Sequence, residues 1–143
     1  MGVSLYYTAR RGHGLSEGEL HGAIGIAIES DRDLFDELNE AIPAWKENGT
    51  VPEHVTDASE ICEGLVLYRP DALTEPGVVL AGSTKVSHGG CGDEPMLMQL
   101  EYYTGFALGR LRRFLPDAEW HVHLDDVDLV WDEETGEYSL PAG

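Results

Sequence analysis

Hydrophobic residues alternate with polar residues, or cluster as β-branched and aromatic types, in several short runs of the chain. Val3, Leu5 and Tyr7 share one face of the first run, which is the period of a half-buried strand. Short segments rich in Pro, Asp and Gly separate neighbouring runs, so we expect the second and third to pair antiparallel and the last two to form a hairpin. The predicted strands cover residues 3–9, 61–69, 77–85, 120–125, 127–131 and 138–140.

Between the first two predicted strands, hydrophobic residues recur at the three- and four-residue spacing of a helix. Ser16 and Glu19 have the spacing of a capping box, so a helix should begin directly after the serine. Three glycines follow, and each costs about 1 kcal/mol relative to Ala in a helix interior. Ser30 and Asp33 predict a second helix start, and Pro43 should disturb that helix near its end. We therefore expect a pair of helices here.

The most regular helical pattern follows the third predicted strand. Asp93 is the candidate N-cap, Pro95 falls in the first turn and Pro116 should end the helix. Arginines near its C-terminal end lie where the helix dipole favours cations. The predicted buried face consists of Leu97, Leu100, Thr104, Leu108, Leu111 and Leu115.

The order of these elements predicts a single α+β domain over residues 1–143. We expect an antiparallel sheet with helices packed on one face, in a ferredoxin-like βαββαβ order with an extra C-terminal β-hairpin. In such a one-sided sandwich, Trp120 and Val122 should face the helices, so His121 and His123 should face away from them. We expect any ligand to bind on that open face, although this fold hosts too many functions to imply one.

Composition narrows the classes of partner. The 143 residues include 27 Asp and Glu against nine Lys and Arg, a formal charge of −18 that repels phosphate backbones and anionic headgroups. We therefore expect no nucleic-acid or membrane partner. The longest apolar run, residues 22–28, is far too short to span a bilayer, and Cys62 and Cys91 are expected as free thiols in a cytoplasmic protein. The charge could instead keep the protein soluble or adapt it to a salty cytoplasm.

Seven carboxylates and no basic residue lie between positions 125 and 137. Their spacing does not fit an EF-hand loop, which leaves either a docking surface for a cationic partner or a solvated hairpin. Two aromatic residues among the charges favour the docking surface, because aromatic residues are enriched in protein interfaces. The predicted partner-binding residues are Asp125, Asp126, Asp128, Trp131, Asp132, Glu133, Glu134 and Tyr138.

A glycine-rich loop, residues 87–93, precedes the helix with the regular pattern. The positive end of the helix dipole should lower the pKa of Cys91, which would then be a nucleophile with His88 or His121 as its base. A weak zinc-site candidate combines His88, Cys91, His121 and His123, because these are ligand types that zinc prefers. The simpler interpretation is a flexible loop and a solvated strand face.

Common catalytic signatures are missing, including the phosphate-binding loop, the Gly-x-Ser-x-Gly elbow and His-Glu-x-x-His. The leading hypothesis is therefore a small acidic non-enzymatic binding protein, an inhibitor or immunity-type partner of a basic protein, which needs no cofactor. The alternative is a small thiol- or zinc-dependent enzyme that uses Cys91, His88, His121 and His123.

Overall fold

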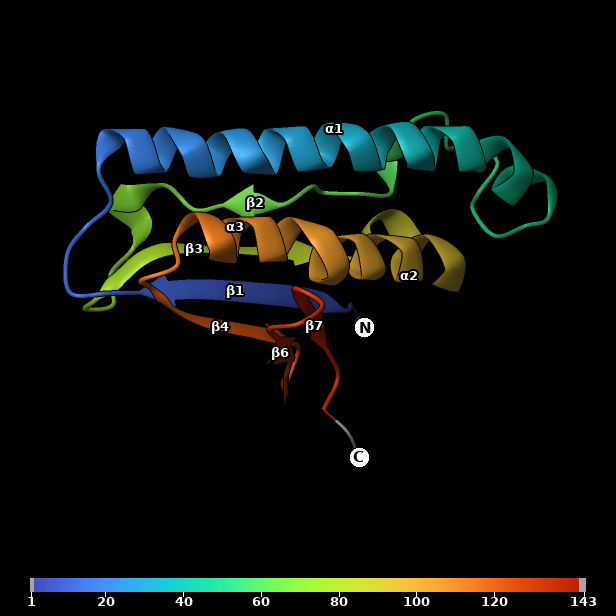
Figure 1. Cartoon of the computed structure of the whole chain (residues 1–143). Helices are drawn as coiled ribbons and strands as arrows, with labels where there is room; N and C mark the ends of the chain where they lie inside the picture. The colour runs from blue at the N-terminus through green and yellow to red at the C-terminus, as the bar shows by residue number, and fades with distance from the viewer. Residues whose placement is uncertain (1, 142–143) are drawn as a thin grey trace.

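The computed structural model describes residues 2–141 and has an α+β fold, with helices packed on one face of an antiparallel sheet (Figure 1). Five strands in the order β2-β3-β1-β4-β5 form the sheet, and every neighbouring pair is antiparallel. Over the described residues, no helix is both long and apolar enough to cross a membrane. The strands are β1 (Ser4–Arg10), β2 (Val66–Leu67), β3 (Val78–Lys85), β4 (Glu119–Leu124) and β5 (Val127–Asp128).

The predicted helix pair is wrong: one helix, α1, runs from Glu17 to Glu47. Its predicted start is confirmed, because the Glu19 amide donates to the Ser16 hydroxyl and the Glu19 carboxylate accepts from the Ser16 amide. Ser30 does not cap a second helix but is buried inside the first one. A continuous row of buried residues faces the sheet, and this burial outweighs the cost of the glycines. Pro43 lies within the helix without ending it.

The second helical region is interrupted, which the regular hydrophobic pattern did not predict. It consists of α2 (Asp93–Tyr102), a π-helical turn η4 (Tyr103–Ala107) and α3 (Leu108–Phe114). Gly92, rather than Asp93, occupies the N-cap position. A π turn adds a residue to the helical repeat and so rotates the face that follows it.

This rotation changes which residues of the region are buried. After the π turn, Leu108 and Leu111 are buried as predicted. Before it, Pro95 and Gln99 take the buried positions, and Leu97 is 49% exposed. The predicted buried face is therefore wrong at Leu97, whereas Leu100 is half-buried against the core.

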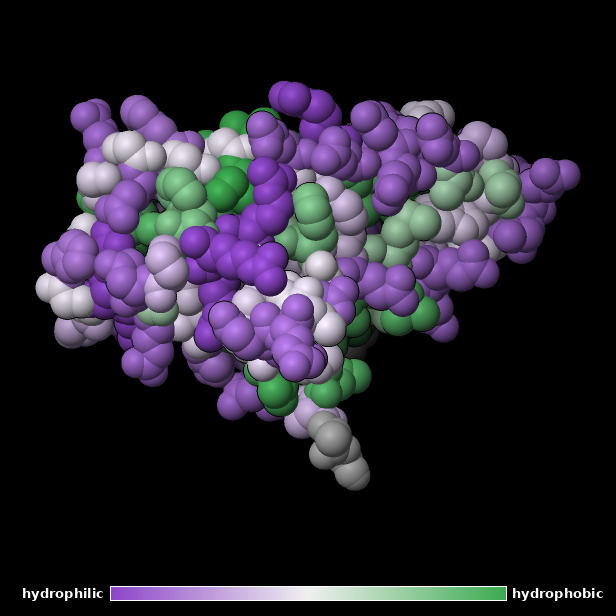
Figure 2. All heavy atoms as spheres, viewed as in Figure 1, coloured by the Kyte–Doolittle hydropathy of each residue, from purple (hydrophilic) through white to green (hydrophobic). Residues whose placement is uncertain are grey.

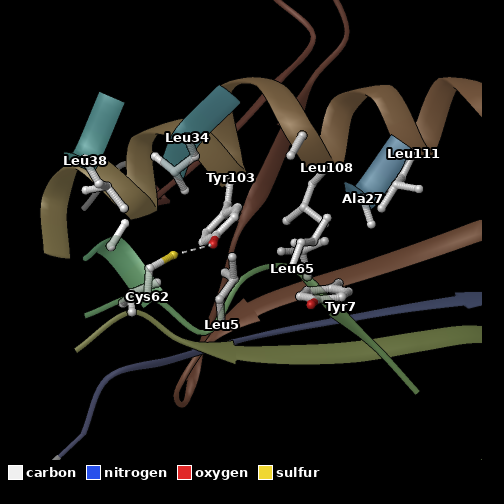
Figure 3. Packing of buried hydrophobic residues seen from close by; sticks show 14 of the residues in the cluster. Leu5, Tyr7, Ala27, Leu34, Leu38, Cys62, Leu65, Tyr103, Leu108 and Leu111 are labelled. Carbon is white, nitrogen blue, oxygen red and sulfur yellow. Dashed lines mark hydrogen bonds between the residues drawn. The ribbon is translucent and has the colours of Figure 1, made fainter. Parts of the chain in front are cut away.

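The core lies between the helices and one face of the sheet (Figure 3). Leu5 and Tyr7 project from β1 toward Leu34 of α1 and Leu108 of α3, and all four side chains are buried. Burial of this apolar surface is the main term that stabilises the arrangement.

Residues 61–69 pair with β3 over a shorter length than predicted. The segment begins after a 3-10 turn, η1 (Ala58–Glu60), and its first half fills the core with Ile61, Cys62 and Leu65. The Leu65 amide donates to the Asp31 carboxylate of α1 instead of a neighbouring strand, with an N···O distance of 2.8 Å. Two further 3-10 turns, η2 (Pro70–Ala72) and η3 (His88–Gly90), flank β3.

A second sheet contains only β6 (Val130–Asp132) and β7 (Glu137–Ser139), which pair antiparallel. We call residues 130–139 the C-terminal ribbon. It leaves the edge of the large sheet after β5 and packs against η4 and α3 (Figure 1).

Candidate functional site

The C-terminal ribbon is anchored to α3 through one arginine. The Arg112 guanidinium carbon lies 4.5 Å from the centre of the Trp131 ring, and its Nη1 donates to the Tyr138 hydroxyl at 3.0 Å. Tyr138 is only 5% exposed. Tyr138, one of the predicted partner-binding residues, therefore packs within the protein, and half-buried Trp131 lies against it.

Two glycines allow the ribbon to approach the helix this closely. A Cβ atom on Gly109 would lie 2.5 Å from the carbonyl oxygen of Gly136, closer than any real contact. Gly136 itself has a φ of 73°, a left-handed conformation that favours glycine in the turn between β6 and β7. Neither Gly109 nor Arg112 belongs to a recognisable motif, so the sequence did not predict their contacts with the ribbon.

Several carboxylates of the acidic segment, residues 125–137, are held by groups of the protein itself. Asp125 accepts from the Ser4 amide at 3.0 Å, and Asp128 lies 2.8 Å from Nε2 of His121. Asp132 accepts from the backbone of the ribbon turn, and Glu133 accepts from the Trp131 indole. These four predicted partner-binding residues therefore also have structural roles.

The remaining carboxylates of this segment belong to exposed residues, and that of Glu137 lies beside Gly105 of η4. Those of Asp126, Glu134 and Glu137 make no hydrogen bond or ion pair with residues 2–141, and all three residues are exposed. Arg112 lies beneath the ribbon, where it contacts the aromatic rings instead of these carboxylates. The ribbon and the preceding turn thus present unpaired negative charge on a fixed backbone.

His121 and His123 face away from the helices, as the alternation of β4 predicted. In the register with β1, His121 lies opposite Thr8 and His123 opposite Tyr6, whereas buried Val122 lies opposite buried Tyr7. The imidazole of His123 stacks on the Tyr6 ring, with 4.8 Å between centroids, and on the His121 ring, with 5.0 Å.

One ring nitrogen of each histidine is held in place. Nε2 of His121 lies 2.8 Å from Asp128, and Nδ1 of His123 lies 2.7 Å from the carbonyl oxygen of Asp125. Because a carbonyl can only accept, Nδ1 of His123 carries the proton and Nε2 is left as an acceptor when the ring is neutral.

A cavity of about 330 Å³ lies beside these histidines on the open face of the sheet. The connection between β2 and β3, residues 70–76, covers one side of it. The polar and charged side chains that line this open-face cavity are Thr8, Arg10, Tyr68, Thr74, Glu75, His121 and His123.

The surroundings of the Cys91 thiol in the glycine-rich loop differ from those that the sequence predicted. Burial raises the pKa of the Cys91 thiol, opposite to the predicted direction, and its Sγ donates to the Val86 carbonyl at 3.6 Å. Nδ1 of His88 lies 3.7 Å from a Glu63 carboxylate oxygen. Gly89, with a φ of 69°, packs its backbone against the Glu60 carbonyl, which fixes the loop there.

The candidate zinc ligands are not brought together either. Across residues 2–141, no group of three or more His, Cys, Asp or Glu side chains is placed to hold a metal ion. The four predicted ligands, His88, Cys91, His121 and His123, therefore do not form one site. Cys62, which the sequence analysis left unused, is buried in the core and its pKa is raised to about 11 by that burial.

Comparison with family models, curated proteins and solved structures found no match to this chain.

Proposed function

We propose that this chain is a small acidic binding protein without enzymatic activity, which holds a cationic protein partner on the C-terminal ribbon and the turn before it. Such a protein would act as an inhibitor or immunity-type partner of a basic protein. One observation carries the proposal: Asp126, Glu134 and Glu137 are exposed and unpaired in the described part of the chain, while Arg112 fixes the ribbon that presents two of them.

Rigid presentation matters because association costs less free energy when the binding surface is already ordered. The Trp131 and Tyr138 rings, packed at 5.0 Å between centroids, give the ribbon a small core of its own. The long-range field of a chain with charge −18 would steer a basic partner toward it and repel acidic competitors. Fast association that weakens with salt is the kinetic signature of this mechanism.

The competing explanation is that the negative charge is spread over the whole surface, where it keeps the protein soluble, and that it binds no particular partner. Hydrophilic side chains cover most of the face drawn in Figure 2, and hydrophobic ones occur there only as small separate patches. A surface acidic everywhere would attract any polycation without preference for the ribbon. The test must therefore compare equal charge changes at two places.

The first variant neutralises the ribbon region with Asp126→Asn, Glu134→Gln and Glu137→Gln. The immobilised chain captures proteins from a lysate of its source at low and at high salt, and association rates are then measured with the captured protein. We expect the captured partner to be basic. Its association rate at low salt should fall roughly tenfold in this variant, because electrostatic steering raises association rates by at least that factor.

The matched control removes the same charge from the exposed face of α1 with Asp33→Asn, Asp36→Asn and Glu40→Gln. This variant should retain most of the association rate. Equal losses in the two variants would assign the effect to overall charge, and recovery of partners without a basic bias would overturn the proposal.

Two finer descriptions also belong to the proposal. We propose a ferredoxin-like fold, which is supported by the spatial strand order β2-β3-β1-β4. In the sequence, one helical region precedes β2 and another follows β3. We propose a cytoplasmic location, supported by the two cysteines, which are free thiols.

A further inference from the structure

The open-face cavity differs from the rest of the protein in its charge balance. Over the whole chain, Asp and Glu outnumber Lys and Arg by 27 to nine. The cavity is instead lined by Arg10, His121 and His123, with Glu75 as the acidic member. In a strongly acidic molecule, this cavity thus has one arginine for its one carboxylate, beside two imidazoles.

The cavity also has apolar surface. Ala81 of β3 lies opposite Thr8 of β1 on the open face. Both are small residues, and larger side chains line the cavity around them. Leu73 and Val78 contribute aliphatic surface, and Tyr68 contributes a ring. A volume of about 330 Å³ is at the lower end for ligand sites, which fits a small molecule.

Arg10 already holds an anion in this cavity. Its Nη2 bonds to the Glu75 carboxylate, which reaches it from the connection between β2 and β3. Both side chains are more than half exposed, so the ion pair is weak and exchangeable. A guanidinium has five donors, and a carboxylate from a ligand can take the place of Glu75 or bind beside it.

We propose that the open-face cavity binds a small organic anion, a carboxylate with an apolar or aromatic body. The carboxylate contacts Arg10 in competition with Glu75, and the body lies over Ala81 beside the imidazole of His121. This site is separate from the ribbon surface and does not depend on the proposed partner.

The test uses three probes of nearly equal shape: benzoate, benzamide and benzamidine. Each is titrated up to about 10 mM against the isotope-labelled full chain, and backbone amide shifts are followed by NMR. Benzoate should shift the amides of Thr8, Ala81 and His121 saturably. Benzamide should bind several-fold more weakly, and benzamidine should leave these amides unchanged.

Two substitutions should then move the benzoate affinity in opposite directions. Arg10→Gln removes the cation and should weaken binding about threefold or more, while Glu75→Gln removes the competing anion and should strengthen it by about the same factor. Arg32→Gln makes the same charge change on the exposed surface of α1 and should have no effect.

The comparison with Arg32→Gln separates a specific site from general electrostatics, because the two arginine variants change the net charge equally. Shifts that do not saturate, equal responses to benzoate and benzamidine, or equal effects of the two arginine variants would each overturn the proposal. A stability measurement on every variant ensures that only folded protein is compared.

Discussion

The two faces of the large sheet are built from alternate residues of the same strands, yet they have different roles. On β1, Tyr7 faces the helices and is 1% exposed, while its neighbour Tyr6 faces the open side and is 37% exposed. Tyr7 donates its hydroxyl to the Val66 carbonyl across the core, whereas Tyr6 stacks on His123 at the surface.

This difference separates the face that stabilises the fold from the face on which we propose that a ligand binds. The helix-covered face is mainly apolar, and some of its few polar groups pair within the core, as in the contact of 3.2 Å between Cys62 Sγ and the Tyr103 hydroxyl. On the open face, Arg10, His121 and His123 retain hydrogen-bonding capacity that a ligand could use. Changes on the covered face should therefore affect folding, and changes on the open face should affect binding.

Substitution of the two adjacent tyrosines should give the largest contrast. Tyr7→Ala should lower the free energy of unfolding by about 3–5 kcal/mol, because it leaves a cavity in the core. Tyr6→Ala should lower it by less than about 1 kcal/mol, because the ring is part-exposed and loses only surface stacking. Urea unfolding followed by circular dichroism measures both values, and similar losses would contradict the division between the faces.

A second contrast concerns Gly82, which lies on the covered face of β3. A Cβ atom there would lie 1.9 Å from the Val66 carbonyl oxygen and 2.5 Å from the Tyr7 ring. Gly82→Ala should therefore displace β2 and cost about 1–3 kcal/mol, in the range of other overpacked cores.

The matched control is Gly25→Ala in α1, where a Cβ atom meets nothing within 4 Å. This change should stabilise the protein by up to about 1 kcal/mol, since Ala is the better helix former. Hydrogen exchange of the Tyr68 amide, which donates to Ala81, reports the displacement of β2 directly. Unchanged exchange in Gly82→Ala would show that the strand tolerates the added methyl group.

The smallest expected effect lies at the edge where β1 joins the helix layer. The side chain of Arg11 is 3% exposed and bonds to the carboxylate of Glu19 in the first turn of α1. Hydrogen bonds from Arg11 and from the Ser16 amide lower the pKa of Glu19 from 4.5 to about 2. A lowered pKa means that this stabilisation is complete above about pH 4.5 and is lost as the pH falls toward 2. Melting temperatures of Glu19→Gln should consequently depend less on pH in this window than those of the wild type.

Glu17→Gln is the control for that measurement, because Glu17 lies in the same helical turn but makes no ion pair within the described residues. Its pH dependence should follow the wild type. If Glu19→Gln also follows the wild type, the bond to Arg11 does not contribute to acid stability.

Local patterns predicted part of the candidate site correctly. The alternation along β4 was sufficient to place His121 and His123 on the open face, because each strand residue points opposite to its neighbour. The acidic segment was also visible in the sequence. By contrast, the burial of Tyr138 depends on Arg112, which is 26 residues away, and the open-face cavity depends on the residues 70–76 that cover it.

The sequence by itself determined the element types, the α1 start and the two faces of β1 and β4, because these follow from periodicity and capping between near neighbours. Only the tertiary structure decided that α1 continues past Ser30, that a π turn rotates the face carrying Leu97, and that Arg112 anchors the ribbon. The reason is physical: these outcomes depend on burial between segments distant in the chain, which can outweigh local propensities of about 1 kcal/mol per residue.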